Sequence, residues 1–311
     1  MLRRCLIAAV LSLAAPAAIA QSAFDTEASH AVILDHETGE ILFSKNGSEP
    51  MAPSSMSKLM TALMVFEALD RGELAMEDTL PVSEEAWRRG GAASGSSTMF
   101  LDVNSRASVE DLLRGIIVQS GNDACIVVAE ALGGTEANFA DMMTERAREL
   151  GLESANFTNA TGWPDEGHVI SAADLARLAR HIIETYPQFY DLYNEAEFTY
   201  NGIRQFNRNP LLGVFEGADG LKTGHTSVAG YGLTASAVRD GERRIVVFNG
   251  MDSQADRADE AERLMRAAFS QFEIQEIVSE GRTVGEAQVY LGEASTVPLR
   301  TAYGLTLGGH R

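Results

Sequence analysis

The stretch MAPSSMSKLMTALMVFEAL, from Met51 to Leu69, leads from a polar start into one of the most apolar helical segments of the chain. A surface helix carries its lysine on a wet face, but Lys58 lies one turn into a segment that is apolar nearly all round. Ser55 and Lys58 are three residues apart, so on a helix they share a face and their side chains can meet. We predict a buried helix over Met56–Leu69 that begins with this serine–lysine pair.

The pair has a chemical use. A serine is a weak nucleophile until a base takes its proton, and a lysine can be that base when burial or a second cation lowers its pKa. The apolar helix supplies the burial. By itself, however, the S-x-x-K pattern is weak, because chance produces it about once in a chain of this length.

Two further motifs follow in order along the chain. Ser120-Gly121-Asn122 lies in QSGNDA at an expected helix start, where serine and asparagine are also ordinary helix caps. Lys222-Thr223-Gly224 lies in GLKTGHT, on an expected strand edge where a lysine and a hydroxyl can bind a carboxylate. Gly224 would let a substrate backbone approach that strand. The three motifs together form the S-x-x-K, S-x-N and K-T-G set of the serine penicillin-recognising enzymes.

The wider sequence resembles the low-molecular-weight penicillin-binding proteins of the D-alanyl-D-alanine carboxypeptidase family. The resemblance rests on GSSTMFLDV, SGNDACIVVAEAL, NGIRQFNRNPLL and DGLKTGHTSVAGYGLTASA, and it covers about residues 28–272. It implies an α+β fold of the penicillin-recognising serine transpeptidase and β-lactamase type, in which helices pack on an antiparallel sheet. It continues into the start of the family's β-rich C-terminal domain and then stops.

The resemblance also implies a mechanism. The substrate would be a peptidoglycan stem peptide ending in D-Ala-D-Ala, which Ser55 attacks at the penultimate residue with Lys58 as its base. Ser120 would relay a proton to the departing D-Ala, and Asn122 would orient Lys58 and the substrate amide. Penicillin would acylate Ser55 as a slow-leaving inhibitor. The family needs no metal and no cofactor.

Substrate binding would fall to the third motif and its neighbours. Lys222 and Thr223 would hold the terminal carboxylate, and the backbone N–H groups of Ser55 and His225 would form the oxyanion hole. Lys222 would also act as the second cation that lowers the pKa of Lys58. Arg208 would add positive charge for the carboxylate, although a purely structural arginine fits the sequence equally well.

Other readings use the same motifs. A class A β-lactamase needs a glutamate in an E-x-x-x-N pattern; Glu153 is near the expected place, but Phe157 replaces the asparagine. A D,D-endopeptidase would share the site and accept cross-linked peptides. A wall-binding protein with an inactive site is a further alternative, although every nucleophilic residue is present. We expect His168 to be a loop histidine and Cys125 a buried packing residue.

The remaining pattern predicts where strands and helices lie. Two hairpins, over residues 31–46 and 231–251, should share one antiparallel sheet, the second turning at Asp240-Gly241. Helices are expected over 108–119, with a capping box at Ser108 and Asp111, and over 122–134, 138–151, 172–186 and 256–272. Residues 88–101 read as a Gly/Ser-rich loop, and short strands follow residue 274.

The composition and the N-terminal pattern restrict the compartment and the binding partners that we expect for the protein. The chain has 311 residues and a net charge of −19, which disfavours binding to nucleic acid or anionic lipid. Residues 1–20 read as a cleaved signal peptide, so we expect export to the periplasm, with Cys125 as the single remaining cysteine and no internal disulfide. We expect a catalytic domain over 21–272 and a partial or short β-rich segment over 273–311. Peripheral membrane contact would require a longer C-terminus.

Overall fold

A five-stranded antiparallel sheet organises the chain. The computed structural model describes residues 24–290 and 294–310, so the predicted signal peptide lies outside the described residues. The sheet has the strand order β2-β1-β11-β10-β9. Its strands are β1 (His30–Asp35), β2 (Ile41–Lys45), β9 (Ala218–Thr226), β10 (Gly230–Arg239) and β11 (Glu242–Met251). The two predicted hairpins therefore share one sheet, as expected, because β1 pairs antiparallel with β11.

The hairpin turns follow from their residues. Asp240 and Gly241 join β10 to β11 with φ values of 53° and 83°, the left-handed pair that a two-residue hairpin turn requires. Side chains then alternate across the sheet. Val32 and Val247, which are register partners, face one hydrophobic core, while Ile33 and Val246 face another. The sheet is therefore buried on both faces.

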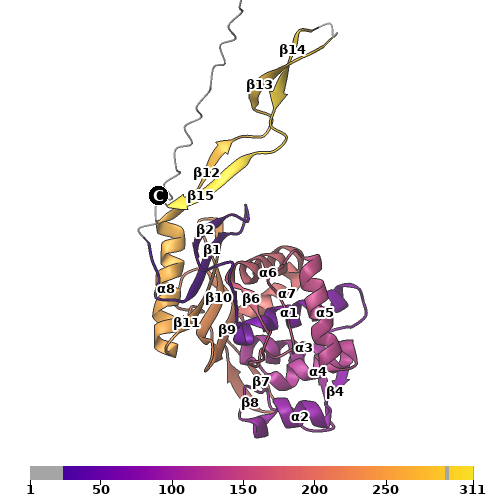
Figure 1. The fold of residues 1–311 in the computed structure, drawn as a ribbon. Helices are drawn as coiled ribbons and strands as arrows, with labels where there is room; N and C mark the ends of the chain where they lie inside the picture. The colour runs from indigo at the N-terminus through magenta and orange to yellow at the C-terminus, as the bar shows by residue number, and fades with distance from the viewer. Residues whose placement is uncertain (1–23, 291–293, 311) are drawn as a thin grey trace, which may run out of the picture.

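Helices cover the two faces unequally (Figure 1). α8 (Gln254–Ser270) packs alone on one face, against β10 and β11. The other face carries α1 (Lys58–Asp70), α2 (Glu84–Gly90), α3 (Val109–Arg114), α4 (Asn122–Gly133), α5 (Glu136–Glu149), α6 (Ala172–Thr185) and α7 (Pro187–Tyr190). The fold is α+β, as predicted, and the helices expected over 122–134, 138–151, 172–186 and 256–272 begin and end within two residues of those bounds.

Three local expectations need correction. The stretch 88–101 is not all loop, because α2 continues to Gly90 after Ser83 caps its start by accepting a hydrogen bond from Ala86 N. The helix expected over 108–119 has its predicted cap, in which Ser108 accepts from Asp111 N, but it changes into a π-helical turn over Gly115–Gln119. The helix expected from Met56 starts earlier, as a 3₁₀ turn over Ser54–Ser57 that runs into α1.

Short strand pairs complete the helical side. β3 (Pro50–Met51) pairs with β6 (Ile170–Ser171), β4 (Thr79–Pro81) with β5 (Arg106–Ser108), and β7 (Glu197–Tyr200) with β8 (Ile203–Phe206). The sequence pattern did not indicate these pairs, because two to four residues are too few to show an alternation. They fix the long loops that lie between the helices.

The C-terminal strands form an arm that extends away from the sheet (Figure 1). β12 (Phe272–Val278) pairs with β15 (Leu305–His310), and β13 (Thr283–Gln288) pairs with β14 (Thr296–Arg300). β12 and β15 also contact β2, and Phe272 is buried against Phe24. The base of the arm is therefore anchored, while its distal strands are exposed.

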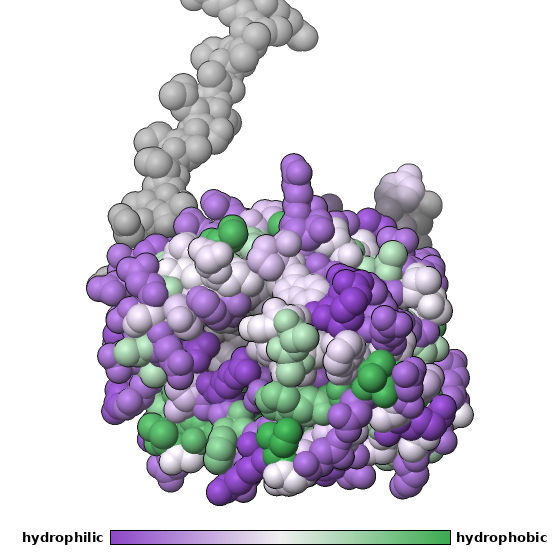
Figure 2. Space-filling view, turned by 90° about the horizontal axis from the view of Figure 1, so that it is seen from below, coloured by the Kyte–Doolittle hydropathy of each residue, from purple (hydrophilic) through white to green (hydrophobic). Residues whose placement is uncertain are grey.

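The surface matches the composition. The face seen in Figure 2 is mostly hydrophilic, and its apolar residues gather towards one side. Among the described residues, no helix combines the length and apolarity that crossing a bilayer would require.

Candidate active site

Ser55 and Lys58 meet where the 3₁₀ turn passes into α1. Lys58 is the first residue of α1 and is 1% exposed, and its Nζ lies 3.0 Å from Ser55 Oγ. The three-residue spacing therefore brings the two side chains together as expected. The turn is held on its other side by Ser54, whose hydroxyl lies 3.1 Å from Thr226 Oγ1 at the end of β9.

The surroundings of Lys58 orient its amine. Besides Ser55 Oγ, its Nζ donates to Asn122 Oδ1 at 2.7 Å and to the carbonyl oxygen of Thr161. The amide and carbonyl oxygens can only accept, so they take both N–H groups of a neutral amine. In the neutral amine the lone pair is then left for Ser55 Oγ, whereas the protonated amine donates to that oxygen at 3.0 Å. The geometry suits proton transfer from the serine to the lysine.

Burial sets the charge state of both lysines. It lowers the pKa of Lys58 to about 8; Cys125 opposes this shift and Arg208 adds to it. The pKa of Lys222 falls well below its ordinary value, first through burial and then through repulsion by Lys58. We expect Lys222 to be a cation that lowers the pKa of Lys58, and the two buried lysines do repel each other. Arg208 lowers the pKa of Lys58 as well. Lys222 Nζ donates to Thr223 O at 3.3 Å.

The second motif lies at the junction of the π turn and α4. Ser120 has a φ of 65°, and its Oγ is buried without a hydrogen-bond partner in the part of the chain that is described. Asn122 begins α4, where its Nδ2 donates to Ser96 Oγ at 3.1 Å while its Oδ1 accepts from Lys58. Neither side chain caps the helix, since the N-cap position is Gly121. Asn122 instead bonds to Lys58 and Ser96, and Ser120 lines the cavity.

The third motif lies on β9, the strand at the edge of the sheet. We expected Gly224 to make room for a substrate backbone, but the structure shows a nearer reason for the glycine. A Cβ there would lie 2.9 Å from Pro53 O and 3.1 Å from Met56 Cγ. Gly224 thus lets β9 lie against the turn that carries Ser55.

A cavity of about 300 Å³ joins the motifs. Lys58, Asn122 and Lys222 are buried and do not line it. Its lining contains hydroxyl groups and arginines but no aspartate or glutamate, which makes it suited to an anion. The lining residues are Ser55, Ser97, Ser120, Arg208, Thr223, Gly224, His225, Tyr231, Gln254 and Arg257.

Two arginines supply the positive charge. Arg208 lines the cavity as predicted, and its Nη1 donates to Ser97 Oγ at 2.7 Å. Arg257, on α8, was not predicted; it is 4% exposed, its guanidinium lies 5.6 Å from the ring centroid of Tyr231, and its Nε has no partner among the described residues. Desolvation lowers the pKa of both arginines, although Arg208, unlike the buried Arg257, still exposes part of its side chain to solvent. A cation in the first turn of a helix opposes the helix dipole, and this was the only sequence signal for Arg257.

The weaker candidates lie outside the cavity. Cys125 is fully buried, and burial raises the pKa of its thiol to about 12, which fits a packing residue. His168 is 2% exposed; burial lowers its pKa to about 4, and its Nδ1 accepts from Thr158 N at 3.1 Å. Glu153 is exposed and Phe157 is part of the core, so neither stands where a β-lactamase would activate water.

Comparisons with known proteins agree with this geometry. The family described as D-alanyl-D-alanine carboxypeptidase matches residues 17–253. The D-alanyl-D-alanine carboxypeptidase DacD of Escherichia coli is 41% identical over 87% of this chain and 70% of its own length. The crystal structure of penicillin binding protein 5 from Haemophilus influenzae superimposes with a TM-score of 0.80 at 37% identity, covering 91% of this chain and 83% of that one.

A ligand-bound relative has the same fold. Penicillin-Binding Protein D2 from Listeria monocytogenes, in the ampicillin-bound form, superimposes with a TM-score of 0.69 at 30% identity. The match covers 80% of this chain and all of that one. These structures confirm the fold that the resemblance implied. The chain therefore belongs to the D-alanyl-D-alanine carboxypeptidase family, and it is a serine peptidase of that family.

Proposed function

We propose that this chain is a serine D,D-carboxypeptidase that removes the terminal D-Ala from peptidoglycan stem peptides ending in D-Ala-D-Ala. The family membership supports this type of reaction. One observation of the chain itself supports the proposal most directly. The amine nitrogen of the buried Lys58 lies 3.0 Å from the hydroxyl oxygen of Ser55, beside a cavity whose lining has no carboxylate.

The steps follow from these positions. Ser55 Oγ attacks the carbonyl carbon of the penultimate D-Ala while the neutral amine of Lys58 takes the hydroxyl proton. The C–N bond then breaks, and Ser120, whose Oγ is otherwise unpartnered, passes a proton to the departing amine of the terminal D-Ala. Water hydrolyses the resulting ester and restores Ser55. The backbone N–H groups of Ser55 and His225 would stabilise the oxyanion.

Recognition of the substrate would rest on its free carboxylate. Arg208, Arg257 and Thr223 line the cavity, whereas Lys222 is buried beside Thr223 and its lowered pKa favours the neutral amine. Charge-assisted hydrogen bonds of this kind contribute about 1.5–3 kcal/mol each.

β-Lactams should acylate the same serine. The ampicillin-bound relative from Listeria monocytogenes supports this inference. We further propose export to the periplasm, on the pattern of residues 1–20, where Arg3 and Arg4 precede a short apolar run and an A-x-A site. Peptidoglycan lies in that compartment, which brings the enzyme to its substrate.

The test compares the wild-type chain with Ser55→Ala. D-Alanine release from a D-Ala-D-Ala peptide and covalent labelling by a fluorescent penicillin are measured on both proteins. We expect the wild type to do both and the variant to do neither. Labelling without release of D-alanine would instead favour an endopeptidase or a wall-binding protein. Rapid loss of the label with accumulation of hydrolysed penicillin would indicate a β-lactamase.

A further inference from the structure

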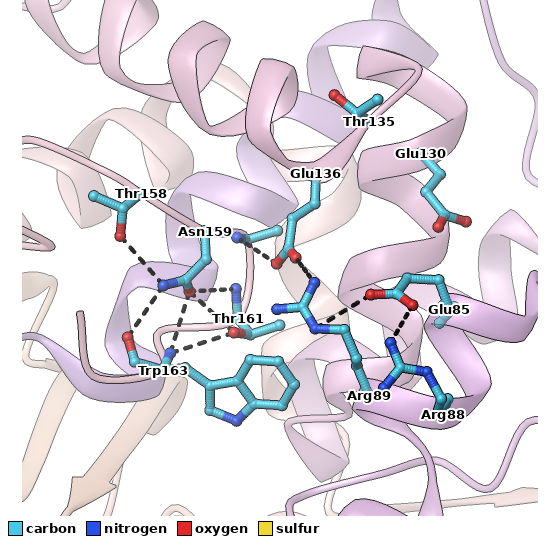
Figure 3. A network of polar contacts seen from close by, with 12 residues as sticks. Glu85, Arg88, Arg89, Glu130, Thr135, Glu136, Thr158, Asn159, Thr161 and Trp163 are labelled. Carbon is cyan, nitrogen blue, oxygen red and sulfur yellow. Dashed lines mark hydrogen bonds and ion pairs between the residues drawn. The ribbon is translucent and has the colours of Figure 1, made fainter.

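The loop over residues 159–163 supplies one of the acceptors that orient Lys58, since Thr161 O accepts from Lys58 Nζ. The side chain of Asn159 organises this loop from within (Figure 3). Its Oδ1 accepts from the backbone N–H groups of Thr161, Gly162 and Trp163 at 3.1, 2.8 and 3.2 Å. The loop is therefore a rigid unit, and its position fixes the position of the Thr161 carbonyl.

The loop also lies directly against the turn that carries the nucleophile. Gly162 has a φ of 80°, and a Cβ at this residue would lie 2.1 Å from Ser54 O. No side chain separates the two segments at this point. A displacement of the loop would consequently change both the approach to Ser55 and the hydrogen bond to Lys58.

Two residues outside the active-site cavity hold this loop in place (Figure 3). Glu136, at the start of α5, accepts from Ala160 N at 3.2 Å with one carboxylate oxygen and from Arg89 Nη1 at 2.8 Å with the other. Arg89, on α2, also lies over the ring of Trp163, 5.2 Å from its centroid. The pair thus contacts the loop on both sides of Thr161, at residues 160 and 163.

We propose that Arg89 and Glu136 are positioning residues for the acylation step, because they clamp the 159–163 loop and so hold the Thr161 carbonyl against the amine of Lys58. The inference rests on the proposed function. Neither residue lines the active-site cavity. They act through the loop, and the free energy of the Arg89–Glu136 ion pair itself contributes little to this role, because Arg89 is about a third exposed.

The expected effect is on rate, since a catalytic group misplaced by about 1 Å can cost on the order of a hundredfold. The pH dependence carries a second signature. Burial lowers the pKa of Lys58, and Glu136 is one of the groups that oppose the shift, so its loss lets the pKa fall further. The charged and titratable groups that act on or with Lys58 are Cys125 and Asp123 of α4, Glu136 of α5, Arg208 after β8, Lys222 of β9, and His168.

The experiment uses the full chain and four variants: Arg89→Ala, Arg89→Lys, Glu136→Gln and the control Arg88→Ala. Arg88 neighbours Arg89 on the same helix and also pairs with Glu85, but it is 60% exposed and Figure 3 draws no contact from it to the loop. The second-order rate constant of acylation by a fluorescent penicillin is measured from pH 6 to 10, with thermal unfolding alongside. Wild type and Ser55→Ala mark the limits of the assay.

We expect acylation to fall by roughly ten- to a hundredfold in Arg89→Ala and Glu136→Gln, by less in Arg89→Lys, and by less than about twofold in Arg88→Ala. The pH midpoint of Glu136→Gln should move below that of the wild type. Lysine keeps the positive charge for Glu136 but lacks the guanidinium that lies over Trp163, so partial rescue fits a positioning role.

Wild-type acylation rates and an unshifted pH profile in Arg89→Ala and Glu136→Gln would overturn the proposal, as would losses matched by Arg88→Ala. A lower unfolding temperature with unchanged acylation of the folded protein would overturn it too, because it would show a purely structural role. If Arg89→Ala does not fold, Glu136→Gln and Arg89→Lys decide the question alone. If the wild type is neither acylated nor active, the proposed function itself has failed.

Discussion

Lys58 can accept the proton of Ser55 only in those molecules in which its own amine is neutral. Burial lowers its pKa to about 8, so at pH 6 nearly all of the amine is charged and at pH 10 nearly all is neutral. The positive charge of Arg208 also lowers the pKa of Lys58, which favours the neutral form of the amine. In the proposed mechanism, the buried helix α1 therefore sets the charge state of the base as well as packing in the core.

We predict that the acylation rate rises with pH and reaches half of its plateau near pH 8. Protonated Lys58 has no lone pair for the hydroxyl proton of Ser55, which gives the rise its sign. Stopped-flow labelling with a fluorescent penicillin from pH 5 to 10 measures it, and Lys58→Arg, which stays protonated throughout, should label at least about a hundredfold more slowly. A flat profile over this range would remove Lys58 as the base.

The residues that could be predicted are those whose chemistry shows in their spacing. Ser55 and Lys58 are three apart on one helix, and Ser120 and Asn122 form a short motif of their own. Arg257 could not be found in this way. It reaches the cavity because α8 packs on β10 and β11, and apart from its place in the first turn nothing in DRADEAERL distinguishes this buried arginine from an exposed one.

At the scale of elements, the second motif is presented by an irregular helix end. α3 passes into a π turn, and Gly115 O accepts from both Ser120 N and Gly121 N. The turn places Ser120 in a left-handed conformation, with its side chain at the cavity. The apolar run GIIVQ fits an α-helix as well as a π turn, so periodicity could not show the change.

The loop opposite this helix end depends on one buried carboxylate. Asp123 is completely buried on α4 and accepts from Thr98 Oγ1, Met99 N and Leu101 N at 2.6, 3.0 and 3.1 Å. The same loop provides Ser97, which lines the cavity and accepts from Arg208. Asp123 therefore connects the stability of the loop to the shape of the site.

We predict that Asp123→Ala lowers the free energy of unfolding by about 3 kcal/mol or more, because it leaves two backbone N–H groups and a hydroxyl buried without acceptors, each at about 1–3 kcal/mol. Urea unfolding at pH 7.5 measures the change, and Asp141→Ala, at an exposed position of α5, is the control. A loss below about 1 kcal/mol for Asp123→Ala would show that water or a shifted loop satisfies these groups.

At the scale of the whole molecule, charge is distributed in two opposing ways. The chain carries a net charge of −19, yet the catalytic cavity is lined by arginines and hydroxyl groups without an acid. Screening confines the overall negative field to within about 10 Å of the surface at 0.1 M salt. In the proposed function, the two arginines at the cavity therefore favour a small anion although the protein as a whole is acidic.

The arm is the part of the molecule with the least connection to this site. Every residue of β14 is exposed, and so is every residue of β13 except Ala287. By contrast, β12 and β15 contact β2 at the base of the arm. Val278 and Leu305 are register partners at the point where the base ends. An Asn-Gly turn between these two residues would close β12 and β15 as a two-residue hairpin and remove residues 279–304.

We predict that this deletion leaves the acylation rate within about twofold and changes the free energy of unfolding by less than about 1 kcal/mol, because exposed residues that leave the core untouched contribute little to stability. Penicillin labelling and urea unfolding of both chains measure the two quantities. Phe272→Ala is the contrasting variant: it removes a buried ring packed against Phe24 and should cost about 3–5 kcal/mol. Slower acylation in the deletion, with unfolding unchanged, would contradict the boundary near residue 272 and show that the distal strands act on the site.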